Sequence, residues 1–373
     1  MTAVTAEYDA LWSSLAAIGR DGSGTNRLPW TAAELEARDW FRSQAERRAL
    51  PVEQDRNGNL WARWGEGDSV VATGSHLDSV ADGGAFDGAL GVVCAFAAVD
   101  ALRDEDVEPQ RPIAVVAFNE EEGARFGRAC LGSKLLTGQL DPDEARALHD
   151  ADGVALGEYL ADPGPGPLPA AYVEVHIEQG RFLDVPLGVA SEIWPHGRFR
   201  FDFLGESNHA GTTPIAARHD AMLDFARATL AARKAAEARG GLATFGRVHV
   251  EPNSTNSIAS LVRAWLDARG PDDAAVEAIV AAIGGRPVRE SWTPAVTFDV
   301  ALRDRIANLL GAPLMTTAAG HDAAILAMAG VPSAMIFVRN RSGVSHAPGE
   351  HAEREDCLVA VGALAHILKE LAC

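Results

Sequence analysis

A histidine and two aspartates directly follow a short apolar run in the first quarter of the chain. The run over residues 70–72 leads into a glycine-rich stretch that contains His76, Asp78 and Asp87. An α/β protein presents metal ligands in this way, at the C-terminal end of its sheet. Glycine backbone can also fold tightly around an ion. The alternative interpretation is a solvated turn that contains acids by chance.

The length and composition of the chain fit a globular protein with a sizeable core. Its 373 residues suit one large or two moderate domains, and 47% of them are hydrophobic while 23% are charged. With a formal net charge of −19, the chain has no surplus of basic residues that could bind phosphate groups. We therefore expect no nucleic-acid partner and no anionic membrane partner.

The sequence also indicates a location. The first residues lack the basic start and apolar centre of a signal peptide. No apolar run approaches the roughly 20 residues that a membrane span needs. The four cysteines have unrelated spacings and form no CxxC pair, which is typical of a reducing compartment. We expect a cytoplasmic protein.

The pattern of apolar residues predicts an α/β sheet in the first half of the chain. Residues 7–50 have helical spacing, and residues 52–71 read as short strands separated by turns. A helix over 92–102 and a buried strand over 113–118 follow. This alternation of buried strands and helices is typical of a sheet with parallel strands.

The pattern changes near residue 197 and predicts a second, smaller domain. The expected order is strand 198–204, helix 218–239, strands 243–250 and 258–267, helix 271–283 and strand 294–300. This βαββαβ order is that of a ferredoxin-like unit. We therefore predict a mixed-sheet α/β catalytic domain, residues 1–196 and 304–373, interrupted by a lid and dimerisation domain, residues 197–303.

Further acids and histidines follow other predicted strands. Glu120, Glu121 and Glu122 come directly after the strand that ends at residue 118. Adjacent carboxylates raise each other's pKa unless a cation is present, although such a run is often a solvated patch. His176 ends the strand that begins near residue 170, and His346 follows the strand 333–338. Four such strand ends together favour a metal centre over isolated structural residues.

Histidines and carboxylates without thiolates suit Zn²⁺, Mn²⁺ or Co²⁺. The five candidate ligands are more than a single ion needs. Two divalent ions that share a bridging carboxylate fit this number better. A neighbouring glutamate that binds no metal can then accept a proton from the attacking water. The ligand candidates are His76, Asp87, Glu122, His176 and His346.

Together these segments resemble the two-metal aminoacylase/carboxypeptidase-like metallopeptidase family. Within it they resemble the hydantoinase/carbamoylase branch, which holds N-carbamoyl-L-amino acid hydrolases, allantoate amidohydrolases and β-ureidopropionases. The similarity runs from about residue 10 to the end of the chain. It implies a metallopeptidase-like catalytic domain with two divalent ions per subunit. The ions would be Zn²⁺, or alternatively Mn²⁺, Co²⁺ or Ni²⁺.

The resemblance assigns roles to the metal-centre residues. It implies that Asp87 bridges the two ions, with His76 and His176 on one side and His346 and Glu122 on the other. Two further residues take supporting roles, Asp78 as the group that orients His76 and Glu121 as the general acid/base. The assignment rests on counting back from Gly123, and a shift of one residue within the triple-glutamate run would change both roles.

The resemblance extends to substrate binding. It implies that His209 reaches a neighbouring active site in a homodimer and stabilises the oxyanion. Asn256 and Arg269 match positions that bind a substrate carboxylate, and arginine does so bidentately. Gln179 and His321 match the ureido-side pocket. Taken without the resemblance, His209 fits a polar turn and His321 fits the start of a helix.

The activity that these residues imply is metal-dependent hydrolysis of a ureido C–N bond in a small molecule that bears a carboxylate. The expected substrate is an N-carbamoyl-L-amino acid, which yields the amino acid, ammonia and carbon dioxide. Allantoate is the first alternative, followed by the substrates of an aminoacylase or a dipeptidase. A metal-free binding relative with the same fold is the alternative from another class. The sequence leaves the substrate side chain and the metal open.

Overall fold

The computed structural model describes residues 2–373 and divides into two compact units. The first unit comprises the residues up to Ser191, Thr297–Met315 and Gly320–Cys373. The second comprises Glu192–Val296 and Thr316–Ala319. The main segment of the second unit begins and ends several residues earlier than the predicted lid, residues 197–303, and Thr316–Ala319 joins it from farther along the chain.

A mixed sheet of nine strands organises the first unit, with the order β1-β2-β4-β3-β5-β13-β6-β11, while β12 also pairs with β6. Its strands are β1 (Val52–Gln54), β2 (Leu60–Trp64), β3 (Val71–His76), β4 (Ile113–Phe118), β5 (Ala171–Ile177), β6 (Leu187–Ile193), β11 (Val296–Thr297), β12 (Leu314–Thr317) and β13 (Ser333–Val338). The prediction of an α/β fold with a mixed sheet is confirmed.

The four central strands, β4, β3, β5 and β13, are parallel neighbours. Every residue in these four strands is buried, which explains the continuous apolar sequence of β4 and the largely apolar sequence of β13. Parallel strands end at the same edge of a sheet. The loops that follow these four strands therefore begin side by side, and these loops carry the predicted metal ligands.

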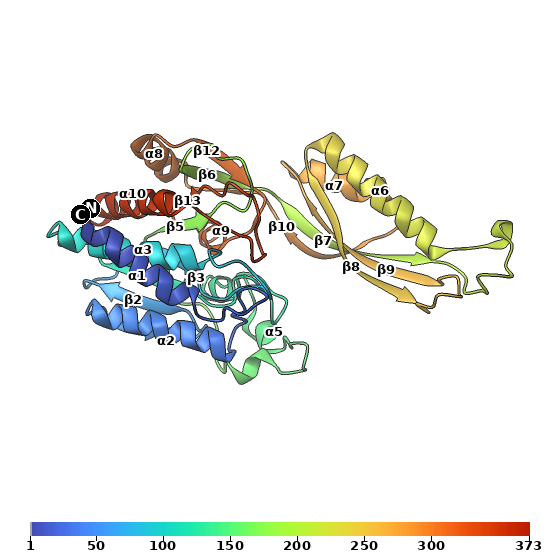
Figure 1. The fold of residues 1–373 in the computed structure, drawn as a ribbon, viewed down its shortest axis with the longest axis horizontal. Helices are drawn as coiled ribbons and strands as arrows, with labels where there is room; N and C mark the ends of the chain where they lie inside the picture. Colours follow the sequence, from blue (N-terminus) through green and yellow to red (C-terminus); the bar gives the residue numbers. More distant parts are fainter. Residues whose placement is uncertain (1) are drawn as a thin grey trace. The chain divides into compact units, whose positions relative to one another are not determined.

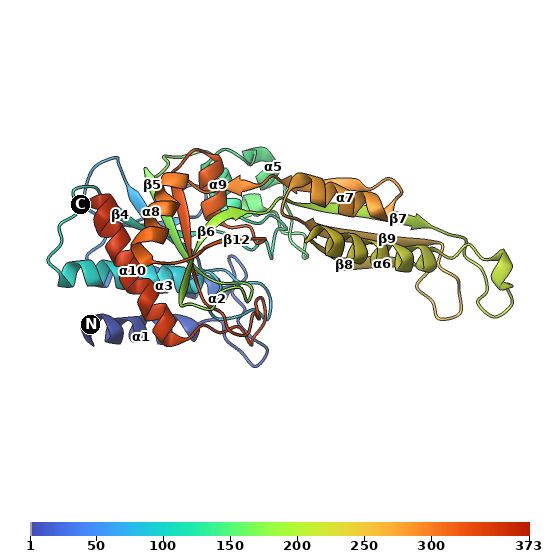
Figure 2. The same ribbon diagram turned by 90° about the horizontal axis from the view of Figure 1, so that it is seen from above.

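Helices cover both faces of this sheet. On one face, α3 packs on β3 and β5 and is itself covered by α1 and α10 (Figure 1). On the opposite face, α9 packs on β5 and β13 (Figure 2). The helices of this unit are α1 (Thr2–Ala16), α2 (Ala32–Arg47), α3 (Ala89–Asp104), α4 (Leu131–Leu136), α5 (Pro142–Arg146), η1 (Leu156–Glu158), α8 (Val300–Leu310), α9 (Asp322–Met328) and α10 (Arg354–Ala372).

The helical spacing predicted over residues 7–50 corresponds to two helices, α1 and α2, which are separated by residues 17–31. Gly19 and Gly24 in this segment have φ angles of 70° and 154°, which interrupt a right-handed helix. Pro29 also disfavours a helical residue before it. This connecting segment lies against the loop after β3, where Thr25 and Gly83 form an antiparallel bridge.

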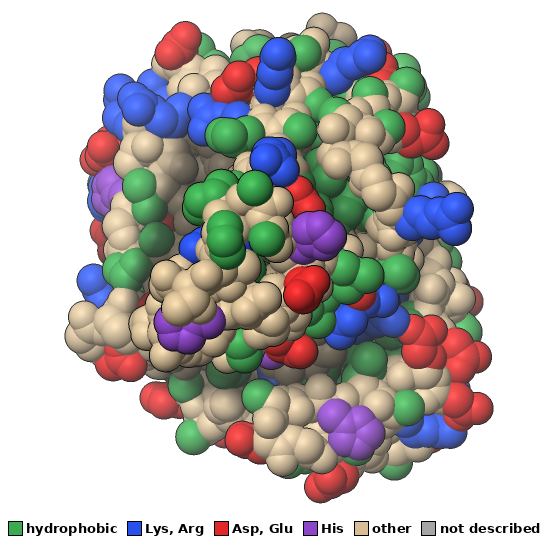
Figure 3. Space-filling view, turned by 90° about the vertical axis from the view of Figure 1, so that its right-hand side faces the viewer, with side chains coloured by type: hydrophobic (Ala, Val, Ile, Leu, Met, Phe, Trp, Pro, Cys, Tyr) green, Lys and Arg blue, Asp and Glu red, His purple; other side chains and the backbone are tan. Residues whose placement is uncertain are grey.

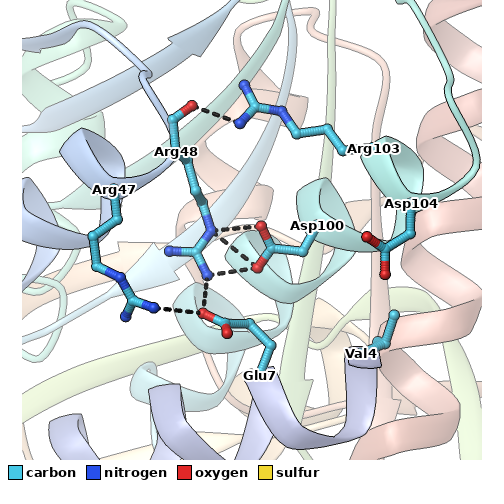
Figure 4. Close-up of a pocket in the computed structure, with 7 residues that line it drawn as sticks. All are labelled: Val4, Glu7, Arg47, Arg48, Asp100, Arg103 and Asp104. Atoms are coloured by element: carbon cyan, nitrogen blue, oxygen red, sulfur yellow. Dashed lines mark hydrogen bonds and ion pairs between the residues drawn. The ribbon is translucent and has the colours of Figure 1, made fainter. Parts of the chain in front are cut away.

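A buried ion network ties the first three helices together. Arg48, at the end of α2, donates to Asp100 of α3 at 2.9 Å and to Glu7 of α1 at 2.8 Å (Figure 4). Its guanidinium also lies over the ring of Phe96. A cavity of about 340 Å³ opens beside these residues. Because its buried arginine is already paired with two carboxylates, we interpret the cavity as part of the helix packing and not as a ligand site.

The second unit is a four-stranded antiparallel sheet with two helices. Its strand order β10-β7-β9-β8 with a βαββαβ chain order is the predicted ferredoxin-like arrangement. Its elements are β7 (His196–Leu204), η2 (Ile215–Ala217), α6 (Ala221–Arg239), β8 (Leu242–Glu251), β9 (Leu261–Arg269), α7 (Asp273–Ile283) and β10 (Val288–Thr293).

The strand predicted over residues 294–300 differs in the structure. The last strand of this unit is β10, which pairs with β7 and ends at Thr293, whereas residues 294–300 hold only the two-residue strand β11, which belongs to the sheet of the first unit. Asp299 accepts a hydrogen bond from the backbone of Leu302 at 2.7 Å and thereby caps α8, which begins at Val300. An N-cap aspartate satisfies a free helix amide, so the chain turns helical here in place of extending the sheet.

The structure also bears on membrane crossing and on how charge is distributed over the surface. Within residues 2–373, no helix combines the length and the apolar character that crossing a membrane requires. Figure 3 shows acidic, basic and hydrophobic side chains interspersed on the face that it draws. The negative net charge is therefore not gathered into one acidic patch on that face.

The close contact between α3 and the sheet leads to a prediction about stability. A Cβ atom on Gly91 would lie 2.3 Å from the backbone oxygen of Val175 and 2.7 Å from Cβ of Ser75. We expect Gly91→Ala to lower the free energy of unfolding by about 1–3 kcal/mol, because the helix must move away from the strands. Denaturant titration measures this change.

Gly362 provides the matched control. It lies on the exposed side of α10, and an added Cβ would meet no atom within 4 Å. We expect Gly362→Ala to raise the free energy of unfolding by about 0.5–1 kcal/mol, because alanine favours the helical backbone. Equal effects of the two substitutions would contradict the packing argument.

Candidate metal centre and substrate-binding residues

His76 ends β3 and is held at the sheet edge by its surroundings. Its Nδ1 lies 3.0 Å from the backbone oxygen of Asp78, so Nε2 points the other way. Gly88 packs against the imidazole, and a Cβ there would lie 2.4 Å from the ring. Gly88 also has a φ of 65°, in the region that favours glycine. Only glycine fits this position without displacing the histidine.

Asp87 lies between the predicted histidines and faces them with both oxygens. Its Oδ1 is 3.4 Å from Nε2 of His76 and 3.1 Å from Nε2 of His176. Its Oδ2 is 3.3 Å from Nε2 of His346. Nε2 of His346 is also 3.4 Å from Oε2 of Glu122. The structure therefore brings together all five predicted ligands, in two groups that share Asp87.

Asp78 fixes the backbone of the triple-glutamate run. Its Oδ1 accepts a hydrogen bond from the amide of Glu121 at 3.2 Å, and its Oδ2 accepts one from the amide of Glu122 at 3.1 Å. Oδ1 also lies 3.5 Å from Nδ1 of His76, farther than the backbone oxygen of the same aspartate. Asp78 thus orients His76 mainly through its backbone, while its carboxylate holds the next loop.

The three adjacent glutamates point to different places. Glu120 turns away from the centre, since its Oε1 accepts from the amides of Arg125 and Phe126 at 3.2 and 2.9 Å. Glu122 faces His346, as described above. Oε2 of Glu121 lies 3.8 Å from Nε2 of His76, and its Oε1 accepts from the thiol of Cys130 at 3.4 Å. This geometry supports Glu121 as the base and Glu122 as the ligand.

The donor atoms fit divalent cations. Two atoms bound about 2.0–2.2 Å from one tetrahedral ion lie about 3.3–3.6 Å apart, close to the separations between these side chains. Nε2 of His76, Nε2 of His176 and Oε1 of Glu122 are buried and have no hydrogen-bond partner among the described residues. Buried polar atoms are otherwise nearly always paired, so these atoms match a coordination role.

The pKa shifts within the cluster of ligand candidates also indicate a cation site. Burial raises the pKa of Glu121 well above its ordinary value and that of Glu122 to about 7. Burial alone would also raise the pKa of Asp87, but the neighbouring imidazoles of His176, His346 and His76 outweigh it and hold the pKa well below the ordinary range. Its bond to Asp87 raises the pKa of His346 to about 9. Crowded carboxylates of this kind are stabilised by cations.

The residues predicted for the ureido side lie next to this centre. Nε2 of Gln179 donates to Oδ2 of Asp87 at 2.9 Å. His321 is buried with its ring centroid 4.4 Å from that of His176, and burial holds its pKa well below the ordinary value. A neutral imidazole at this position has a free Nε2 that can meet a polar group of a ligand.

The other predicted residues belong to the second unit. His209 is exposed, and the amide of the next residue, Ala210, donates to the backbone oxygen of Asn256 at 2.9 Å. His209 and Asn256 therefore lie close together. Arg269 donates from Nε and Nη2 to the carboxylate of Asp267, at 2.7 and 3.1 Å. The guanidinium of Arg269, which was predicted to bind a substrate carboxylate, thus binds a carboxylate of its own chain.

Two buried acids next to the centre were missed by the sequence analysis. Oε1 of Glu350 accepts from the amides of Phe86 and Asp87, both at 2.9 Å. Glu174 lies near His176 and His321, but its oxygens already accept from Ser75 at 2.7 Å and from Ala323 at 3.2 Å. Glu174 is therefore a structural carboxylate. The only signal in the sequence is its place two residues before His176 on a buried strand.

Comparison with known proteins agrees with this geometry. The model for "Peptidase family M20/M25/M40" matches residues 67–370. An N-carbamoyl-L-amino acid amidohydrolase of Geobacillus stearothermophilus is 36% identical, over 98% of both chains. An allantoate amidohydrolase of Escherichia coli is 32% identical, over 96% of both chains. A solved amidase of the hydantoinase/carbamoylase family from Burkholderia vietnamiensis is 30% identical, with a TM-score of 0.87, over 98% of this chain and 97% of that one.

The different directions of the three glutamates lead to a prediction. We expect Glu122→Gln to lower the metal content of the purified protein, because it removes a charged donor from one group of ligands. We expect Glu121→Gln to keep the metal and to lower kcat by at least about 10²-fold, as loss of a general base does. Elemental analysis and steady-state kinetics measure the two effects.

Glu120→Gln is the matched control in the same run. Its side chain faces the backbone of Arg125 and Phe126, so metal content should stay at the wild-type value. Loss of metal in Glu121→Gln with retention in Glu122→Gln would show that the roles are exchanged.

Proposed function

The chain belongs to peptidase family M20/M25/M40, and we propose that it hydrolyses the carbamoyl C–N bond of an N-carbamoyl-L-amino acid. The predicted resemblance is confirmed by the family match and by the relatives in the hydantoinase/carbamoylase branch. The protein is an amidohydrolase of this branch, which acts on C–N bonds other than peptide bonds. The family is metal-dependent, and the clustered side chains of the first unit can bind metal.

The observation that carries the proposal is the position of Glu121 beside two groups of metal ligands. In this proposal His76, His176, Asp87, Glu122 and His346 hold two divalent ions, which supply Lewis acidity toward the carbonyl and lower the pKa of water. Glu121 accepts the proton of the attacking water and delivers it to the departing nitrogen. Burial raises its pKa, which favours a carboxylate that can hold the proton it accepts before passing it on.

Substrate binding is assigned to polar residues of both units. We propose that Arg269 binds the substrate carboxylate, in exchange for its present pairing with Asp267, and that Asn256 adds a hydrogen bond. We propose that Gln179 and His321 bind the ureido group. The products of a carbamoyl amino acid would be the free amino acid, ammonia and carbon dioxide.

Two further parts of the proposal concern the assembly and the location. We propose a homodimer in which His209 of each subunit donates to the oxyanion formed in the other subunit's active site. Support comes from the exposure of His209, whose Nδ1 accepts from the amide of Gly211 at 3.0 Å, so that Nε2 is the nitrogen available to another molecule. Cytoplasmic location stays a prediction from the cysteine pattern.

Allantoate is the second candidate substrate. The 32% identity to an allantoate amidohydrolase over nearly the full length supports it, because allantoate also joins a ureido group to a carboxylate. Ammonia release from N-carbamoyl-L-amino acids and from allantoate, and release of free amino acids from dipeptides, each measured with Zn²⁺, Mn²⁺, Co²⁺ or Ni²⁺ supplied, distinguish these substrates. Release from allantoate alone would replace the first proposal, and hydrolysis of dipeptides alone would refute both.

The role of Arg269 leads to a prediction about substrate affinity. We expect Arg269→Lys to raise KM by about 10-fold or more with a smaller effect on kcat, because lysine cannot bind a carboxylate bidentately. Arg263 is the matched control, since it lies on the same strand and binds Asp202 bidentately at 2.7 and 2.8 Å. Equal KM values for Arg269→Lys and Arg263→Lys would contradict the assignment.

The dimer proposal can be tested by mixing two inactive variants. We expect His209→Ala and Glu121→Gln each to lose activity while keeping their metal. If His209 acts on the neighbouring site, random mixed dimers regain about one quarter of wild-type activity, because half of the dimers hold one complete site. Failure to regain activity after verified subunit exchange would show that His209 acts within its own subunit or has no catalytic role.

A further inference from the structure

We propose that Arg27 is a positioning residue for the metal centre, which anchors the loop carrying His76 and Asp78 and places a buried positive charge beside its carboxylates. Arg27 lies in the segment between α1 and α2, upstream of residues 67–370, the part that matches the family model. Its side chain is fully buried. The inference rests on the proposed metal centre and adds a residue to it from outside the matched region.

Arg27 holds the chain on both sides of Asp78. Its Nε donates to the backbone oxygen of Leu77 at 2.7 Å, and its Nη1 donates to that of Ile18 at 3.3 Å. Its own amide donates to Oγ of Ser79 at 2.9 Å, and its carbonyl accepts from the amide of Ser79 at 3.1 Å. The residue before Asp78 and the residue after it are therefore both fixed by Arg27.

The neighbours of Arg27 extend this attachment along the loop. Thr25 and Gly83 exchange two backbone hydrogen bonds of 3.0 Å. Oγ of Ser79 also donates to the backbone oxygen of Thr25 at 3.2 Å. Asn26 accepts from the amide of Asp82 at 2.8 Å and donates to its carboxylate at 3.2 Å. Residues 25–27 thus form a continuous support for residues 77–83.

The support is transmitted to the metal ligands through Asp78. The backbone oxygen of this residue fixes Nδ1 of His76, and its carboxylate fixes the amides of Glu121 and Glu122. A shift of residues 77–79 would therefore move the ring of His76 directly. It would also displace Glu121 and Glu122 through their backbone amides. Outer hydrogen-bond partners of this kind typically change metal affinity by about 10- to 100-fold when they are removed.

The charge of Arg27 gives a second reason for its position. A buried guanidinium is costly unless negative groups compensate it. No carboxylate among the described residues pairs with Arg27 in a direct salt bridge, and its Nη2 has no hydrogen-bond partner there. Burial lowers the pKa of Arg27 to about 10, and attraction from Asp78, Asp87 and Glu350 opposes a larger fall. Arg27 therefore stays charged at neutral pH, and the acidic groups of the centre balance its charge.

The experiment compares the removal of two buried arginines from the same unit. Arg27→Met keeps an unbranched apolar stem and removes the donors and the charge, while Arg48→Met does the same at the ion network of α1, α2 and α3 (Figure 4). Zinc retained by each protein is measured after equilibration with increasing chelator, and the thermal midpoint of each apo-protein is recorded.

We expect Arg27→Met to lose zinc at a chelator activity at least about 10-fold lower than the wild-type protein. Arg48→Met should lower the thermal midpoint and keep the wild-type zinc affinity. Arg27→Lys should lie between Arg27→Met and the wild-type protein, because it keeps the charge but cannot reach two carbonyl groups as a planar fork. Wild-type zinc affinity in Arg27→Met, or an equal loss in Arg48→Met, would overturn the proposal.

A smaller substitution covers the case in which Arg27→Met does not fold. Ser79→Ala removes the hydroxyl that joins Arg27 to Thr25 and keeps the buried charge. We expect a several-fold lower zinc affinity, and unchanged affinity would overturn the anchoring role. If the wild-type protein binds zinc but releases no ammonia from any ureido substrate, the proposed function fails while the role of Arg27 stands.

Discussion

The metal centre depends on the parallel register of four neighbouring strands. In this register His76 of β3 pairs with Phe118 of β4, and Ile177 of β5 pairs with Val338 of β13. The four strands therefore finish nearly level, and the loops after them start at one edge. Side chains from residues 76 to 346 can then converge on Asp87 without any long excursion of the backbone. This is the general location of ligand sites in sheets with parallel strands.

Within this frame, backbone hydrogen bonds to buried carboxylates set the finer geometry. Asp78 binds the amides of Glu121 and Glu122, and Glu350 binds the amides of Phe86 and Asp87. Each of these acids belongs to one loop and fixes the backbone of another. The loops at the sheet edge therefore support one another, and few of them could move alone. Such mutual support is what a preorganised site requires.

Much of the fold and most of the metal centre could be predicted from the sequence, because their signals are local. Apolar runs predicted β4 and β13 with the observed bounds, and polar residues at strand ends or in the loops after them included all five ligand candidates. The short strand β12 and the strand β6 were missed, and so was α8, although its Leu302 and Ile306 have helical spacing. The helical spacing over residues 7–50 did not show where α1 ends and α2 begins, which glycines in residues 17–31 determine.

The residues that could not be predicted act through contacts that are distant in sequence. Arg27 bonds to Leu77, 50 positions away, and Glu350 bonds to Asp87, 263 positions away. Neither residue lies in a motif of its own, and an arginine or glutamate in a loop is usually solvated. Only the packed structure shows that both are buried beside the centre. The supporting residues of a site are thus harder to find than its ligands.

The position of β13 has a consequence for the order in which the chain can fold during synthesis. This strand lies between β5 and β6 in the sheet, yet it is the last strand of the chain. The elements of the second unit, in contrast, run without interruption from β7 to β10. Domains fold as units from the N-terminus while the chain is made. The inserted unit can therefore complete its sheet while the surrounding one still waits for its central strand to leave the ribosome.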